Sequence, residues 1–175
     1  MSKKYFIGGL LICIALALVT LIGIKALNKK STAHFPQVMP FFEAIYTNGK
    51  LFSSDSLESS NIVLVFYSPG CMFCEHEGKE MANNASVFAE NQLLFVTCAP
   101  IDSAAAYTQR TRIGAIPHFY SLVDTSLIIP RLFGLRSIPT TLLYDEHRRF
   151  VMGFEGEVNA AKLGKTMRNY EGNNK

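Results

Sequence analysis

The sequence predicts an α/β fold in which helices flank a central mixed sheet. Two short runs of apolar, β-branched and aromatic residues, 61–67 (NIVLVFY) and 92–98 (QLLFVTC), are typical of strands that are buried on both faces. The composition between them, from Cys71 to about Glu90, is helical. Because a strand, helix, strand unit closes by a right-handed crossover, the two strands are expected to lie parallel in one sheet.

A hairpin is predicted before this unit. Residues 41–46 and 50–52 flank the pair Asn48 and Gly49, which accepts positive φ at both central positions of a type I′ turn. After the unit, residues 118–123 form a weaker third apolar run. These segments are expected to add strands to the same sheet.

The second half of the chain predicts another hairpin and three helices. Residues 140–144 and 149–154 are strand-like and are joined by the polar turn 145–148 (DEHR). The helices are expected at residues 102–112 with Asp102 as the cap, at 126–134 with Gly134 as the end, and at 158–170 with Val158, Ala161, Leu163 and Met167 covering the sheet.

The positive charge of the chain is concentrated at its start. Five lysines and no acidic residue lie in residues 1–30, and the remainder is near-neutral. No cluster of Arg and Lys interleaved with aromatic residues is present, so the sequence offers no face for neutralising a run of phosphates. Nucleic-acid binding is therefore not expected.

The same segment predicts a membrane anchor. Residues 5–24 carry no charge, and at ~1.5 Å per residue a helix of this length spans the ~30 Å of a bilayer core. Residues 25–28 (KALN) lack a signal cleavage pattern, so an uncleaved anchor is favoured, and Cys13 is interpreted as apolar rather than lipid-modified. Lysines on both sides leave the orientation open. We expect an anchor in residues 1–30, a tether in 31–40 and a soluble domain in 41–175.

Two cysteines carry the most specific chemical signal. Cys71 and Cys74 lie three residues apart at the start of a predicted helix, where unpaired N–H groups and the helix dipole favour a thiolate. Cys71 is expected to be the more exposed and to attack a partner's disulfide, after which Cys74 displaces the mixed disulfide. In reverse, the pair oxidises a dithiol. A lone CxxC pair also supplies half of some zinc sites, so the spacing alone does not distinguish a redox pair from a metal site.

Two segments resemble the conserved halves of thioredoxin-like proteins. Residues 61–77 (NIVLVFYSPGCMFCEHE) resemble the first core strand and active-site helix, and residues 133–156 (FGLRSIPTTLLYDEHRRFVMGFEG) resemble the second half. Over about residues 40–170 the chain is similar to membrane-anchored proteins of the TlpA and ResA type. The resemblance implies a thioredoxin-like thiol-disulfide oxidoreductase that acts on cysteine-containing proteins outside the cytoplasm, with the reducing direction favoured.

No cofactor is expected beyond a redox-active disulfide between Cys71 and Cys74. The sequence carries no nucleotide, flavin or haem motif, so electrons are expected from thiol exchange with another protein. The predicted tether to a membrane favours a membrane thiol-disulfide donor. The resemblance places the soluble domain in a bacterial periplasm or cell envelope.

The resemblance also implies a docking edge. It gives Pro139 a cis peptide bond next to the cysteine pair and makes Ile138 and Pro139 the edge that pairs with an extended substrate. The alternative is that Pro139 only starts a strand. The chain departs from typical thioredoxins at Val65, which replaces a buried aspartate, and at Tyr67 and Gly70, which replace tryptophans.

Glu77 matches a glutamate near the active site of the ResA and TlpA type. It is a candidate for proton transfer with Cys74, and the alternative is a solvated glutamate favoured by the helix dipole. Because a buried valine cannot relay protons, the base would be this residue, His76 or water. Met72 and Phe73 are expected to form an apolar contact surface around the first cysteine.

Two other functions remain open from the sequence. Cys71, Cys74, His76 and Cys98 would form a zinc or copper site if all four converged on one ion at about 2.0 to 2.3 Å. The competing interpretation makes His76 a helix-surface residue and Cys98 a small core residue, with no metal site. A peroxidase is the third possibility, but SPGCMFC does not resemble the threonine-rich segment of peroxiredoxins.

Overall fold

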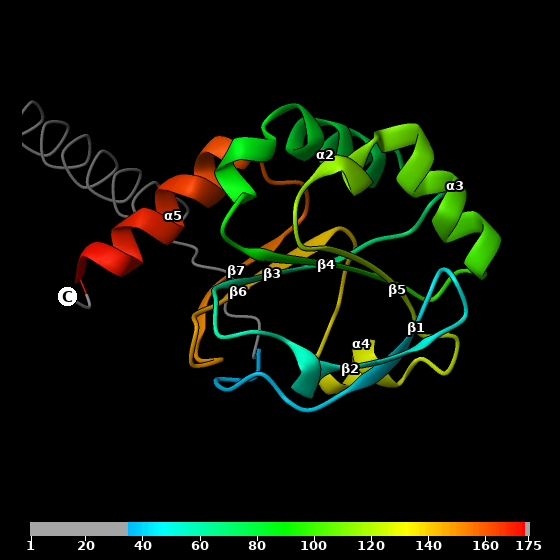
Figure 1. Cartoon of the computed structure of the whole chain (residues 1–175), viewed down its shortest axis with the longest axis horizontal. Coiled ribbons are helices and arrows are strands. Elements are labelled where there is room, and N and C mark those ends of the chain that lie inside the picture. Colours follow the sequence, from blue (N-terminus) through cyan, green and yellow to red (C-terminus); the bar gives the residue numbers. More distant parts are fainter. Residues whose placement is uncertain (1–34, 174–175) are drawn as a thin grey trace, which may run out of the picture. The chain divides into compact units, whose positions relative to one another are not determined.

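The computed structural model describes residues 35–173, which form a seven-stranded sheet with helices on both faces (Figure 1). The strand order is β2-β1-β5-β4-β3-β6-β7. The strands are β1 (Glu43–Tyr46), β2 (Leu51–Ser53), β3 (Ile62–Phe66), β4 (Gln92–Thr97), β5 (Phe119–Val123), β6 (Thr140–Tyr144) and β7 (Phe150–Glu155). The helices are α2 (Met72–Asn83), α3 (Ile101–Thr111), α4 (Ile128–Leu132) and α5 (Ala160–Asn173), with the short 3-10 turns η1 (Ser54–Ser56), η2 (Ala85–Phe88) and η3 (Ile113–Ala115).

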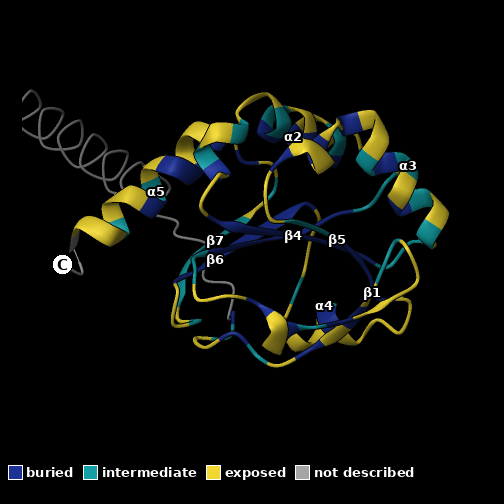
Figure 2. Cartoon of the chain, viewed as in Figure 1, coloured by how far each residue is buried: buried dark blue, intermediate teal, exposed yellow. Residues whose placement is uncertain are grey.

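The sheet separates two apolar cores, because successive side chains of a strand point to opposite faces. In β3, Val63 and Val65 pack on the side of α2, α3 and α5, whereas Ile62, Leu64 and Phe66 pack on the side of α4. None of the five is more than 2% exposed, and Figure 2 shows the central strands in the buried colour. The prediction of a strand covered on both faces is confirmed.

The sheet is mixed, as expected. β3 pairs in parallel with β4, which pairs in parallel with β5, and β3 pairs antiparallel with β6. The predicted hairpin of β6 and β7 is present, and the weak third run forms β5. Because β3 and β4 are parallel, the loops that follow them leave the sheet at the same edge. These loops carry Cys71 and Cys98.

The first hairpin is confirmed, but its predicted type I′ turn is wrong. The Tyr46 N–H donates to the Lys50 carbonyl at 2.8 Å, which leaves a three-residue loop at 47–49, and the Gly49 N–H donates to the Tyr46 carbonyl at 2.9 Å. Gly49 has a φ of 82°, whereas Asn48 is not among the residues with positive φ. This is the three-residue loop in which a type I turn is followed by a left-handed glycine. Asn48 instead accepts a hydrogen bond from the Lys50 N–H at 3.0 Å.

Several helix boundaries differ from those predicted. Asp102 does not cap α3, because the helix begins at Ile101 and Pro100 occupies the capping position without a side-chain hydrogen bond. The helix after the first cysteine ends at Asn83, and η2 covers part of the remaining stretch. In α5 the buried alanine is Ala160 rather than Ala161, because Ala160 lies on the same helix face as Leu163 and Met167, which follow it by three and seven residues.

The predicted membrane anchor, residues 5–24, lies outside the described residues. Within residues 35–173, no helix is both long and apolar enough to cross a membrane. The end of the predicted tether already packs against the domain: Phe35 and Met39 are 4% exposed, and the Met39 N–H donates to the Arg148 carbonyl at 2.8 Å. The domain therefore begins earlier than the expected boundary at residue 41.

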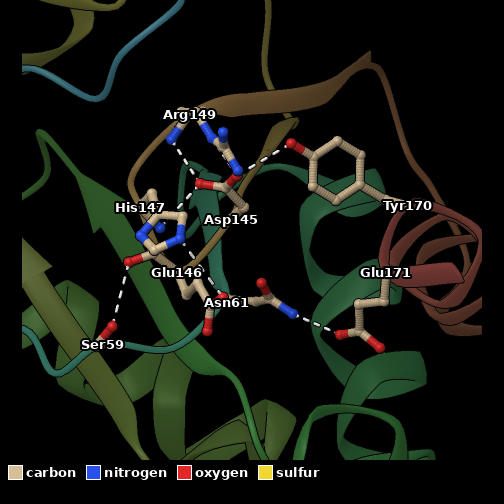
Figure 3. A network of polar contacts seen from close by, with 8 residues as sticks. All are labelled: Ser59, Asn61, Asp145, Glu146, His147, Arg149, Tyr170 and Glu171. Atoms are coloured by element: carbon tan, nitrogen blue, oxygen red, sulfur yellow. Dashed lines mark hydrogen bonds and ion pairs between the residues drawn. The ribbon is translucent and has the colours of Figure 1, made fainter. Parts of the chain in front are cut away.

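A polar network holds the turn between β6 and β7 to the end of α5 (Figure 3). Asp145 is buried at its centre and accepts hydrogen bonds from the backbone N–H groups of His147 and Arg149, from Arg149 Nε at 2.7 Å and from the Tyr170 hydroxyl at 3.0 Å. Burial alone would raise the pKa of Asp145, but these hydrogen bonds lower it below the usual 3.8. The carboxylate is thus stabilised in its charged form.

Asp145→Asn is expected to lower the free energy of unfolding by about 2 kcal/mol, because the amide cannot accept all of these hydrogen bonds. The folded pKa is depressed, so this stabilisation exists above the unfolded pKa and is lost as the pH falls through the folded value. Urea unfolding at pH 7 and pH 3 measures both effects. Asp55→Asn removes a mostly exposed ion pair with Arg148 and serves as the control with little effect.

Candidate functional site

The two cysteines occupy the start of α2 with unequal exposure. Cys71 is the capping residue and is half-buried, whereas Cys74 lies in the first turn and is 1% exposed. The Cys74 N–H donates to the Cys71 Sγ at 3.2 Å. Both thiols are free in this structure. The expectation that Cys71 is the more exposed of the pair is confirmed.

Cys74 is held in its protonated form. Burial, followed by the hydrogen bond with Cys71, raises the pKa of the Cys74 thiol to about 12. Charges on neighbouring groups, Glu77 among them, act in the same direction. A thiol with this pKa reacts at neutral pH only if a nearby group takes its proton.

Glu77 lies about one helical turn after the buried thiol, further along α2. It is 1% exposed, its Oε1 accepts a hydrogen bond from the Thr141 hydroxyl at 2.8 Å, and its Oε2 is buried without a hydrogen-bond partner. Burial raises the pKa of Glu77 to about 8, although the bond from Thr141 lowers it. The alternative of a solvated first-turn glutamate is therefore wrong.

The segment before β6 lies at the same edge of the sheet as the cysteines. The peptide bond between Ile138 and Pro139 is cis, as the resemblance implied. Phe66 pairs with Thr140, so the antiparallel register places Pro139 opposite Tyr67, at the start of the loop that leads to the first cysteine. Ile138 is 48% exposed. The geometry is compatible with an edge that receives an extended peptide.

Exposed apolar side chains lie both between the two cysteines and in the segment before β6. Met72 and Phe73, between the two cysteines, are 75% and 57% exposed. A groove of about 520 Å³ adjoins Ile138 and is lined by Ser68, Ser137 and Cys98, among other residues. Exposed apolar side chains beside a reactive group are typical of a surface that contacts another protein.

Comparison with known proteins identifies the family. A family model described as a thioredoxin-like domain matches residues 56–171. The chain belongs to the thioredoxin-like family. No curated protein sequence matches it.

Solved thioredoxin-like structures have the same fold. DsbF from Mycobacterium tuberculosis is 21% identical with a TM-score of 0.64, and the match covers 73% of this chain and 93% of that one. A thiol:disulfide interchange protein from Chlorobium tepidum is 20% identical with a TM-score of 0.64, covering 76% and 94%. The peroxidoxin BcpB from Mycobacterium tuberculosis is 19% identical with a TM-score of 0.65, covering 77% and 96%. At these identities the likeness establishes the fold, and the chemistry has to be argued from the site.

The ligands of the alternative metal site do not converge. His76 lies on the surface of α2, where its Nδ1 contacts Glu157 Oε1, and Cys98 lies in the groove beside Ile138. Within residues 35–173 no group of three or more His, Cys, Asp or Glu is placed to hold a metal ion. The interpretation of Cys98 as a core residue is also wrong, since it is half-buried just after β4, where burial raises the pKa of its thiol.

Two contact residues were missed by the sequence reasoning. Thr141 binds Glu77 from β6, and the Tyr107 hydroxyl donates to the Cys74 carbonyl from α3 at 2.6 Å. Thr141 stands two residues after Pro139, on the strand that pairs with β3, and the register was not predictable in detail. Tyr107 lies in a helix whose packing on α2 left no sequence signal.

Proposed function

We propose that this thioredoxin-like protein is a thiol-disulfide oxidoreductase that reduces disulfides of protein substrates. One observation carries the proposal: a half-buried thiol at a helix N-terminus lies against a buried second thiol, with Cys74 N–H 3.2 Å from Cys71 Sγ. Thiol exchange requires this arrangement, because one sulfur must be accessible to the substrate and the other must lie close enough to attack the first.

The reaction follows two exchanges. The Cys71 thiolate attacks one sulfur of the substrate disulfide, a bond forms between them, and the other substrate sulfur leaves as a thiolate that takes up a proton. Cys74 then loses its proton and attacks the Cys71 sulfur. The substrate sulfur that was bound to Cys71 leaves as a thiolate and takes up a proton. The protein keeps the new disulfide, having given two electrons to the substrate. A partner dithiol restores the reduced pair by the same steps in reverse.

Glu77 is proposed to accept the Cys74 proton. Its pKa of about 8 leaves a useful fraction of carboxylate near neutral pH, and its unpartnered Oε2 is available as an acceptor. Thr141 fixes the carboxyl from the other side. Val65, which replaces the buried aspartate of typical thioredoxins, packs in the same core as Cys74, so in this protein the acid group comes from the helix and not from the strand.

The substrate is proposed to dock along Ile138 and Pro139, with Met72 and Phe73 as apolar contacts around the reactive sulfur. Ile138 is exposed at the sheet edge beside the cysteine loop, and both other side chains are more than half exposed. An extended peptide in this position would present its own disulfide to Cys71. Main-chain pairing of this kind accepts many sequences, which suits a protein with several cysteine-containing substrates.

The proposed location is outside the cytoplasm, with a single-pass anchor in residues 5–24 and electrons supplied by a membrane thiol-disulfide donor. The uncharged segment supports the anchor. The location is supported by the relatives: one is a secreted Mycobacterium tuberculosis disulfide oxidoreductase, and another is an exposed lipoprotein thioredoxin of Streptococcus pneumoniae. The chemistry uses no cofactor beyond the cysteine pair.

The reduction potential of the Cys71 and Cys74 pair tests this function and its direction. Equilibration with glutathione mixtures, followed by alkylation of free thiols, is expected to give a value more negative than about −200 mV, the range of reducing members of this class. A value near −120 mV would reverse the direction to that of an oxidant. Failure of the pair to form a disulfide at any potential would overturn the function itself.

A further inference from the structure

The turn that carries the cysteines is held from one face of α3. Tyr107 and Arg110 are three residues apart in this helix and therefore project from the same side. The Tyr107 hydroxyl donates to the Cys74 carbonyl at 2.6 Å, and Arg110 Nη2 donates to the Pro69 carbonyl at 3.1 Å. The two carbonyls stand before and after the segment that contains the reactive sulfur and both exposed apolar side chains.

The Tyr107 contact depends on a glycine. A Cβ atom on Gly78 would lie 2.3 Å from the Tyr107 hydroxyl oxygen and 3.2 Å from Thr111 Cγ2, so only glycine lets the phenol reach across α2. In a regular helix the Cys74 carbonyl accepts from the N–H four residues on, which belongs to Gly78, and the phenol adds a second donor to that carbonyl. The close approach is therefore built specifically around Cys74.

The phenol itself is held rigidly. Tyr107 is fully buried, and its ring lies 4.2 Å from that of Tyr67 and 6.2 Å from that of Phe95, measured between centroids. Because the ring is packed against these aromatic side chains, its hydroxyl stays in place and restrains the Cys74 carbonyl to which it donates. Arg110 is partly exposed and also pairs with Glu75, which lies on α2 one residue after Cys74.

We infer that Tyr107 and Arg110 are positioning residues that hold the Cys74 sulfur within reach of the Cys71 sulfur. This inference rests on the proposed function and names what sets the efficiency of its second step. Resolution is an intramolecular attack, so its rate and equilibrium depend on the effective concentration of one sulfur at the other. The two hydrogen bonds raise that concentration by fixing the backbone on both sides of the reactive cysteine.

The test is the glutathione equilibrium of the full-length protein in detergent, compared between wild type and Tyr107→Phe. Loss of the hydroxyl is expected to lower the equilibrium constant for the internal disulfide about fivefold, the effect of one neutral hydrogen bond. The rate at which Cys71 reacts with a small disulfide is expected to stay unchanged. Tyr144→Phe is the matched control: it removes a buried hydroxyl that donates to the Pro36 carbonyl at 3.2 Å in the other core.

An equilibrium constant within twofold of wild type in folded Tyr107→Phe would overturn the inference, as would an equal fall in Tyr144→Phe. Arg110→Gln gives an independent measurement if the first variant does not fold, because this side chain is partly exposed. It is also expected to lower the constant, and an unchanged value would count against the inference. The wild-type value tests the proposed function, whereas the ratio of the variant's constant to that of the wild type tests this inference, so the two failures are distinguishable.

Discussion

Cys71→Ser is expected to reduce the turnover of a disulfide-bonded protein to the uncatalysed rate. Cys71 is the only one of the two motif thiols that reaches the surface, and a serine hydroxyl does not attack a disulfide at neutral pH. The remaining thiol is buried with a pKa of about 12, so it cannot take over the first attack. Steady-state reduction of a small disulfide-bonded protein by dithiothreitol measures the loss.

Cys98→Ser is the control for this prediction. Cys98 is half-buried and lies in the groove beside Ile138, so its loss tests whether any nearby thiol suffices. Turnover close to wild type is expected. If Cys71→Ser kept a substantial part of the activity while Cys98→Ser lost it, the assignment of the nucleophile would be wrong.

Glu77→Gln is expected to slow the attack of Cys74 by roughly 100-fold at pH 8, the contribution of a positioned general base. In the wild type this step should accelerate as the pH rises through about 8, where the buried carboxyl becomes charged. The glutamine variant should lack that acceleration because the amide cannot accept the proton. Single-turnover measurements from pH 6 to 10 separate this step from the first attack, which should respond little to the substitution.

Glu77→Gln is expected to raise the stability of the protein at high pH, although it slows the reaction. The folded pKa of Glu77 lies above its unfolded value of 4.5, so between pH 4.5 and about 8 the unfolded state binds fewer protons and stability falls as the pH rises. Glu77→Gln should therefore stabilise the protein at pH 9, on the order of 5 kcal/mol, with the gain vanishing below pH 4.5. The amide can still accept the bond from Thr141.

Glu75→Gln supplies the matched comparison from the neighbouring turn. The hydrogen bond from Lys79 lowers the pKa of Glu75, so removing this carboxylate cannot stabilise the protein at high pH. If both variants gained stability at pH 9, the effect would reflect a general loss of negative charge. If neither did, Glu77 would not be a buried carboxyl group with a raised pKa.

The central sheet was predictable from sequence because its strands are buried on both faces. β3 consists entirely of apolar residues and β4 contains four in succession, 93–96, and such runs predict a buried strand independently of the neighbouring elements. The turn between β1 and β2 was mispredicted because Asn48 and Gly49 suit two hairpin loops, and the choice depends on loop length and pairing register. Local propensity does not specify that register.

The site was predictable only in part. The cysteine pair and Pro139 are marked by spacing and by resemblance, whereas the role of Glu77 depends on burial, which a helix position alone does not determine. Thr141 and Tyr107 reach the site across tertiary contacts from β6 and α3. Their contacts with the site depend on how elements distant in the sequence pack together, so no local sequence pattern predicts them.

The most direct test of the account is the trapping of a mixed disulfide. Cys74→Ser leaves the Cys71 nucleophile intact and removes the thiol that releases the substrate, so incubation with a disulfide-bonded protein should give a one-to-one covalent adduct. Peptide mapping by mass spectrometry is predicted to find the link at Cys71, with Cys98 free. No adduct, or an adduct attached only through Cys98, would contradict the claim that the motif at the start of α2 is the exchanging centre.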